Sequence, residues 1–129
     1  MTPDSPNAFK GKKGFKRVLN AARYSYDGFT AAWLTESAFR QICLLALFGG
    51  AMLVVLPIDR QAWALIIASH LFSMAVELLN SAIEAAVDHT SLEVHPLAKR
   101  AKDMGSAAQF VCLVNLAAVW SLAVFDSFF

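Results

Sequence analysis

Two glutamates, Glu77 and Glu84, interrupt a stretch of the chain that is otherwise apolar enough to cross a membrane. A carboxylate near the centre of a bilayer costs at least about 2.5 kcal/mol on insertion scales, so it usually faces a partner helix or a ligand. At about 100° per residue, both glutamates share one face of a helix with Asn80, Ser81 and Asp88. This polar face predicts chemistry or transport at a membrane.

The two glutamates suit different chemistry because they lie at different depths. Glu84 follows Glu77 by seven residues, which is about 10 Å along a helix at 1.5 Å per residue. Glu77 suits a base that takes a proton from an alcohol, whereas Glu84, nearer the aqueous boundary, suits a divalent metal ion. Alternatively, the polar face joins helices by hydrogen bonds, which fits Asn80 and Ser81 better than two carboxylates. His70, farther along this face, is interpreted as a packing or interfacial histidine.

Further charged groups precede the first and third apolar segments. Glu36 is either a second metal ligand at the depth of Glu84 or a carboxylate that complements a helix dipole, with Thr35 as the cap. Lys102 can neutralise a phosphate, and Asp103 can accept hydrogen bonds from a sugar or base. Basic clusters at the start of a span usually only set topology, but opposite two carboxylates this one favours a nucleotide ligand. The sequence lacks a P-loop, a G-x-G-x-x-G motif and a protein-kinase catalytic loop.

The composition indicates an all-α integral membrane protein. The 129 residues are 57% hydrophobic and 16% charged, with a mean hydropathy of +0.51, which excludes an ordinary soluble domain. Three apolar segments predict membrane spans at about 36–58, 62–88 and 105–126. Ten of the eleven Lys and Arg residues lie before the first apolar stretch, which begins at Ile42, or between the second and third spans. This bias places the N-terminus and the loop from His89 to Gly105 in the cytoplasm and the C-terminus outside.

The segment before the first span predicts an amphipathic surface helix at about 14–34. Its larger apolar residues recur at spacings of three and four: Phe15, Val18, Leu19, Ala22, Tyr26, Phe29 and Trp33. Such a helix lies in the headgroup layer, packs on the bundle, or does both. Residues 1–13 have no periodicity and predict a flexible tail before a single domain at 14–129. Cys43 and Cys112 fit neither a disulfide nor a metal pattern and are assigned to packing.

Residues 77–88 (ELLNSAIEAAVD), followed by 101–108 (AKDMGSAA), resemble the signature of the small bacterial membrane diacylglycerol kinase family. Four further segments match its pattern: GFKR (14–17), AARYS (21–25), AAW (31–33) and ESAFRQ (36–41). The resemblance implies a homotrimer in the bacterial inner membrane, each protomer having one surface helix and three spans. It also implies transfer of the γ-phosphate of MgATP to the hydroxyl of diacylglycerol, which gives phosphatidic acid. No nucleic-acid partner is implied.

The same resemblance implies roles for individual residues. Glu77 is the catalytic base, Asn80 orients the reacting groups, and Glu36 and Glu84 bind Mg²⁺. The residues implied for ATP are Arg17, Tyr24, Glu36, Glu84, Glu93, Val94, His95, Lys102 and Asp103. Those implied for the lipid are Arg17, Ala21, Ala22, Arg23, Tyr24, Ser25, Tyr26, Thr30, Ala31, Ala32, Trp33, Ala38, Phe39, Arg40, Gln41, Ile42, Val55, Leu56, Pro57, Ile58, Trp63, Glu77, Ser106 and Trp120.

Two other functions remain open at this stage. The segment from His95 to Lys99 also resembles related undecaprenol kinases of the same fold, which leaves undecaprenol as an alternative acceptor. A small proton-coupled transporter could use Glu77 as a proton relay. It would not require Glu36, Glu84, Lys102 and Asp103 at one cytoplasmic boundary. A scaffold without activity gives no reason for a carboxylate in the membrane.

Overall fold

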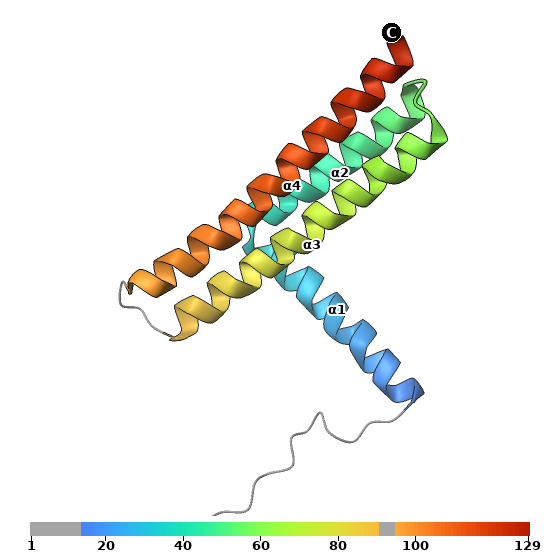
Figure 1. Cartoon of the computed structure of the whole chain (residues 1–129). Coiled ribbons are helices and arrows are strands. Elements are labelled where there is room, and N and C mark those ends of the chain that lie inside the picture. Colours follow the sequence, from blue (N-terminus) through green and yellow to red (C-terminus); the bar gives the residue numbers. More distant parts are fainter. Residues whose placement is uncertain (1–13, 91–94) are drawn as a thin grey trace, which may run out of the picture.

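The computed structural model describes residues 14–90 and 95–129, which form four α-helices (Figure 1). These are α1 (Phe15–Thr35), α2 (Ser37–Val55), α3 (Arg60–Thr90) and α4 (Pro96–Phe128). Helices α2, α3 and α4 are each long and apolar enough to cross a membrane. The prediction of an all-α fold with three membrane-capable helices is therefore confirmed. The predicted tail at 1–13 lies outside the described residues, as do Glu93 and Val94.

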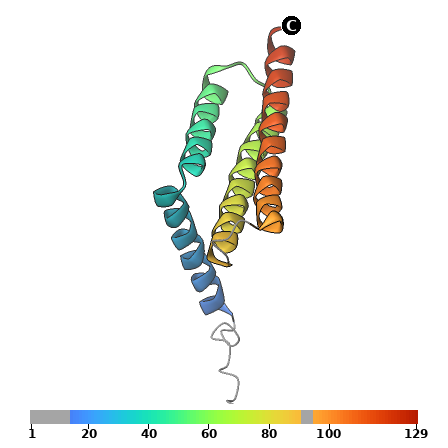
Figure 2. The same cartoon turned by 90° about the vertical axis from the view of Figure 1, so that its left-hand side faces the viewer.

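Helix α3 lies at the centre of the arrangement. It packs along α4 and α2, whereas α1 contacts α2 and leaves the bundle at an angle (Figures 1 and 2). The C-terminus and the turn between α2 and α3 lie at one end of the bundle. The junction between α3 and α4 lies at the other end (Figure 1). Residues of α3 can therefore meet partners from both neighbouring helices.

The predicted loop from His89 to Gly105 is too long, because helices occupy most of it. Helix α3 continues to Thr90, and α4 begins at Pro96. Proline suits the first helical position, and the His95 Nδ1 accepts a hydrogen bond from the Leu97 backbone N–H at 3.1 Å. Hydropathy detects only the apolar part of such a helix. With 31 and 33 residues, α3 and α4 are about 46 and 50 Å long and exceed a bilayer core of about 30 Å.

The apolar core is small and lies near the turn between α2 and α3. Leu53, Ile58, Ile66 and Ala123 are buried against one another there, while most large apolar side chains are exposed. In lipid, helices associate through close packing and interhelical hydrogen bonds rather than through the hydrophobic effect. The contacts between α3 and α4 follow this rule.

In the described part of the chain, three hydrogen bonds between uncharged side chains join α3 to α4. Gln109 Nε2 donates to Ser73 Oγ at 2.9 Å, and Asn115 Nδ2 donates to Ser69 Oγ at 3.1 Å. The Trp120 indole N–H donates to His70 Nε2 at 3.2 Å. His70 is buried, which confirms its interpretation as a packing histidine. These bonds fix the rotation of α3, so that its polar face points into the bundle.

Both cysteines are free thiols, as predicted. Cys112 is buried in α4, and Cys43 is half-buried in α2. Neither belongs to a group of His, Cys, Asp or Glu side chains able to hold a metal ion in the described part of the chain. Such thiols commonly pack as small apolar side chains.

Candidate functional site

A sharp junction between α1 and α2 positions Glu36. Its backbone is extended, with φ −104° and ψ 108°, and its N–H donates to the Ala32 carbonyl at 2.8 Å. The Arg40 guanidinium donates to the Trp33 carbonyl at 2.8 Å, which satisfies an acceptor at the end of α1. Residues on both sides of the junction thus fix its bend, and Glu36 lies half-buried at that bend.

Thr35 orients the Glu36 side chain instead of capping α2. Its hydroxyl lies 3.1 Å from Glu36 Oε1 and 2.9 Å from the Ala31 carbonyl. The N-cap of α2 is Glu36 itself, without a side-chain capping bond. The prediction of Thr35 as the cap is therefore wrong, because the chain is still helical at that residue. A threonine hydroxyl in the last turn of a helix can bond a carbonyl one turn earlier.

Three carboxylates come together at the centre of the site. Glu77 is 4% exposed, and both Glu84 and Glu36 interact with it electrostatically. Glu84 belongs to the same helix, two turns nearer the α3–α4 junction, whereas Glu36 comes from the α1–α2 junction. Like charges so arranged repel one another, and a proton or a cation relieves that repulsion.

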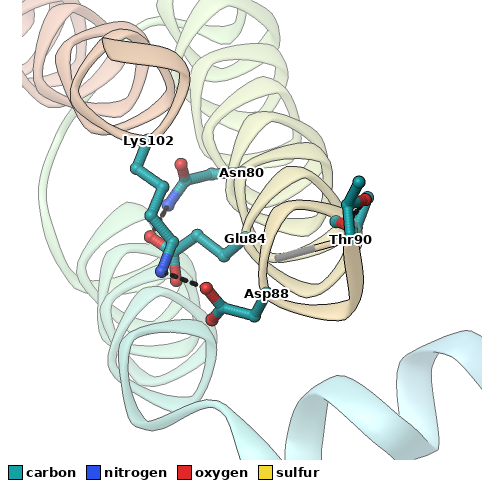
Figure 3. A network of polar contacts seen from close by, with 6 residues as sticks. Asn80, Glu84, Asp88, Thr90 and Lys102 are labelled. Carbon is teal, nitrogen blue, oxygen red and sulfur yellow. Dashed lines mark hydrogen bonds and ion pairs between the residues drawn. The ribbon is translucent and has the colours of Figure 1, made fainter. Parts of the chain in front are cut away.

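Asn80 lies between the two carboxylates of α3. Its Nδ2 points toward Glu84 Oε1 at 3.4 Å (Figure 3). Its Oδ1 is buried and has no hydrogen-bond partner. A buried acceptor without a partner is costly, and such groups often serve a functional site. Asn80 is therefore placed to orient Glu84 on one side and to accept a further hydrogen bond on the other.

The start of α4 brings basic residues to the same end of α3. Lys102 Nζ reaches across to Asp88 Oδ1 at 2.7 Å, close to Glu84 (Figure 3). Lys99 and Asp103 form a second ion pair within α4 at 2.5 Å. Exposed pairs of this kind contribute little stability, so their main effect is to orient side chains. The sequence analysis placed Asp88 on the polar face but gave it no role. Its position one helical turn after Glu84 could have identified it as part of the site.

Two of the other residues predicted for ATP lie on a different helix from Lys102. Arg17 and Tyr24 belong to α1, whose beginning lies far from the α3–α4 junction (Figure 1). His95 caps α4, and Glu93 and Val94 lie outside the described residues. Among residues 14–90 and 95–129, no three potential ligands are arranged to hold a metal ion. Two carboxylates nevertheless fit Mg²⁺, which commonly takes one or two carboxylates and completes its shell with phosphates and water.

An apolar cavity of about 320 Å³ lies where α1, α2 and α3 meet. Four residues predicted for the lipid line it: Tyr26, Thr30, Trp33 and Phe39. Sequence reasoning missed four others: Phe29, Leu34, Cys43 and Met74. The spacing of Phe29 from Tyr26 and Trp33 could have identified it, but nothing in the sequence pairs Cys43 with Met74. The cavity suits the hydrocarbon part of a ligand.

Other residues predicted for the lipid lie elsewhere in the structure. Val55, Leu56, Pro57, Ile58 and Trp63 surround the α2–α3 turn, at the end of the bundle opposite the α3–α4 junction (Figure 1). Trp120 bonds His70, and Ser106 is exposed on α4. Of the neighbours of the cavity residues, Ala32 and Ile42 are buried and Arg40 supports the junction. Ala21, Ala22, Arg23, Ser25, Ala31, Ala38 and Gln41 are exposed.

The chain is similar to known proteins over most of its length. The family described as prokaryotic diacylglycerol kinase matches residues 23–124. A protein named diacylglycerol kinase from Pseudomonas aeruginosa is 54% identical over 117 residues, covering 91% of this chain and 95% of that protein. A Helicobacter pylori protein of the same name is 52% identical and covers 84% of each chain. Its namesake from Escherichia coli K12 is 42% identical and covers 89% of this chain and 94% of the relative.

The matched segment contains most of the site described above. It includes the α1–α2 junction with Glu36, the polar face of α3, and the start of α4 with Lys102. Family membership also agrees with the three membrane-capable helices of a bacterial membrane protein. The chain belongs to the prokaryotic diacylglycerol kinase family.

Proposed function

We propose that this chain transfers the γ-phosphate of ATP to the hydroxyl of 1,2-diacylglycerol, giving phosphatidic acid and ADP. Membership of the diacylglycerol kinase family supports the reaction class. The observation that carries the proposal is the buried Glu77 with two further carboxylates acting on it. The apolar cavity lined by Trp33 and Phe39 is suited to acyl chains.

In the proposed reaction, Glu77 takes the proton from the lipid hydroxyl as the hydroxyl oxygen attacks the γ-phosphorus. The new P–O bond forms as the bond to the β-phosphate oxygen breaks, and ADP leaves with that electron pair. Phosphoryl transfer needs positioning and charge neutralisation more than covalent help from protein. Asn80 orients Glu84 beside the base.

The start of α4 supplies positive charge to the nucleotide. Lys102 neutralises phosphate oxygens, with Asp88 holding its ammonium at the site. Glu36 and Glu84 would hold Mg²⁺, which neutralises charge on the ATP phosphates when bound. Asp103 accepts hydrogen bonds from the nucleotide once it leaves its pair with Lys99. Glu93, Val94, His95, Arg17 and Tyr24 remain part of the proposed nucleotide site.

The proposed enzyme works as a homotrimer in the bacterial inner membrane, with its N-terminus and the α3–α4 junction in the cytoplasm. The distribution of Lys and Arg supports this topology. Glu84, Asp88 and Lys102 then face cytoplasmic ATP, while the deeper Glu77 faces the lipid. In this arrangement α1 lies as an amphipathic helix at the membrane surface, and residues 14–129 form one domain.

The test is transfer of labelled γ-phosphate from MgATP by purified protein in mixed micelles, with diacylglycerol and undecaprenol offered separately. We expect labelled phosphatidic acid. Replacing Glu77 by Gln keeps the side-chain shape but removes the base, so kcat should fall by roughly 10² to 10⁴-fold. A thermal unfolding curve shows whether the variant is folded.

Three other outcomes of this assay would change the proposed function or the proposed base. Labelled undecaprenyl phosphate in place of phosphatidic acid would make the chain an undecaprenol kinase. Equal activity of the wild type and Glu77→Gln would remove Glu77 as the base. Folded, magnesium-supplied protein that labels neither lipid would overturn the kinase proposal, and proton-coupled transport would then be measured in proteoliposomes.

A further inference from the structure

Gly105 of α4 lies directly against Asn80 of α3. A Cβ atom placed on Gly105 would overlap the Asn80 Oδ1 and lie 3.2 Å from its Cγ. Gly105 is buried, and its backbone is not in the left-handed region that favours glycine. Since glycine weakens a helix relative to alanine, the reason for this glycine is the space taken by the Asn80 amide.

The contact fixes the direction of the whole Asn80 amide group. The amide is planar, so the position of Oδ1 against Gly105 determines where Nδ2 points. In the structure Nδ2 points toward Glu84 Oε1, 3.4 Å away. A side chain at position 105 would force Oδ1 to move, and Nδ2 would turn away from Glu84 with it.

We propose that Gly105 is a positioning residue of the phosphotransfer site. By leaving room for the Asn80 amide between α3 and α4, it keeps Nδ2 directed at Glu84 and keeps that carboxylate where it would hold Mg²⁺. Gly105 acts only through Asn80. The inference rests on the proposed function, because Glu84 and Asn80 have their roles from it.

The chain contains a matched control, Gly50. It also lies inside a helix, but an added Cβ there would meet no atom within 4 Å. Gly50→Ala and Gly105→Ala therefore make the same chemical change. At Gly50 the added methyl group enters open space, and at Gly105 it meets Asn80. Both are compared with the wild type in the native full-length protein.

The first experiment measures kinase activity as magnesium and diacylglycerol are varied in turn. A residue that orients a metal ligand typically changes metal affinity or activity by about 10 to 100-fold. We expect Gly105→Ala to raise the magnesium concentration for half-maximal activity by at least about tenfold, with a much smaller change in the KM for diacylglycerol. Gly50→Ala should match the wild type. Full activity of Gly105→Ala at wild-type magnesium would overturn the proposal.

The second experiment tests whether Gly105 acts through Asn80. In an Asn80→Ala background, a Cβ at position 105 no longer meets the amide, and the Cα of residue 80, at 3.8 Å, is in ordinary van der Waals contact. Gly105→Ala should then cause no further loss of residual activity or of magnesium affinity. Equal losses in both backgrounds would show that Gly105 acts independently of Asn80.

Thermal unfolding of the wild type, Gly105→Ala, Asn80→Ala and the double variant gives a readout that does not depend on turnover. The cost of Gly105→Ala should be smaller in the Asn80→Ala background, since the two groups compete for one space. If Gly105→Ala does not fold, the double variant should restore folding; a double variant that also misfolds would contradict the proposal. A wild type without kinase activity would refute the proposed function, while this cycle would still test the packing.

Discussion

At the residue scale, the site combines carboxylates that repel one another with a lysine that pairs with a nearby aspartate. Glu77 is buried with Glu36 and Glu84 acting on it, and Lys102 approaches from α4 to pair with Asp88. Three acidic groups in one place are unfavourable without a cation. A bound cation relieves this repulsion, and the proposed Mg²⁺ would be such a cation.

Replacing Glu84 by Gln tests the metal assignment at this scale. The change keeps the shape of the side chain and removes the charge, so the magnesium concentration for half-maximal activity should rise by at least about tenfold. The KM for diacylglycerol should change much less. Both are measured in the phosphate-transfer assay.

Asp88→Asn is the matched control for that prediction. Asp88 lies one helical turn after Glu84 and pairs with Lys102, so its loss should affect the KM for ATP more than the magnesium requirement. A magnesium titration of Glu84→Gln that superimposes on the wild-type curve would remove Glu84 from the metal site.

At the element scale, glycines let polar side chains lie between the helices. Gly49 of α2 faces His70 of α3, and an added Cβ would overlap the imidazole Nε2. The same nitrogen accepts the hydrogen bond from Trp120 of α4. One buried histidine thus contacts both α2 and α4. It lies in the half of α3 that is nearer the α2–α3 turn.

Gly49→Ala should destabilise this contact. The imidazole ring cannot shorten, so it must move, and its Nε2 is the atom that accepts the Trp120 hydrogen bond. Overpacking of this kind typically costs about 1–3 kcal/mol. Thermal unfolding in micelles should show a lower midpoint than for the wild type. Gly50→Ala, on the adjacent residue with open space around it, should not lower the midpoint. Equal midpoints for the two variants would refute the packing argument.

At the scale of the whole molecule, one chain covers only part of its polar face. The three-helix bundle has a small core, and α1 leaves it at an angle (Figure 2). On the polar face of α3, Glu77 and Asn80 are buried, Ser81 and Glu84 are half-buried, and Asp88 is exposed. Further chains would cover the exposed part of this face, which agrees with the proposed trimer.

Native mass measurement in mild detergent should give a particle of three 14.1 kDa chains. Crosslinking within membranes should yield dimeric and trimeric bands, because detergent extraction can itself dissociate an assembly. The active fraction from size separation should coincide with the trimer. Phosphate transfer by a particle of one chain would contradict the proposed assembly.

The sequence by itself determined the features that depend on near neighbours. Helical periodicity placed Glu77, Asn80 and Glu84 on one face, hydropathy identified three membrane-capable helices, and the motif at 77–88 identified the family. These inferences hold because residues three, four or seven apart share a helix face whatever the helix packs against. Hydropathy placed the third span at about 105–126, whereas α4 already begins at Pro96, because the first turns of that helix are polar.

Only the tertiary structure decided which helices meet and at which residues. It paired Lys102 with Asp88 and Lys99 with Asp103, lined a cavity with Cys43 and Met74, and placed Gly105 against Asn80. Such contacts depend on how far each helix is rotated about its axis and where it crosses its neighbour. Periodicity along one helix carries no information about either quantity, so the role of Gly105 appears only once α3 and α4 are packed together.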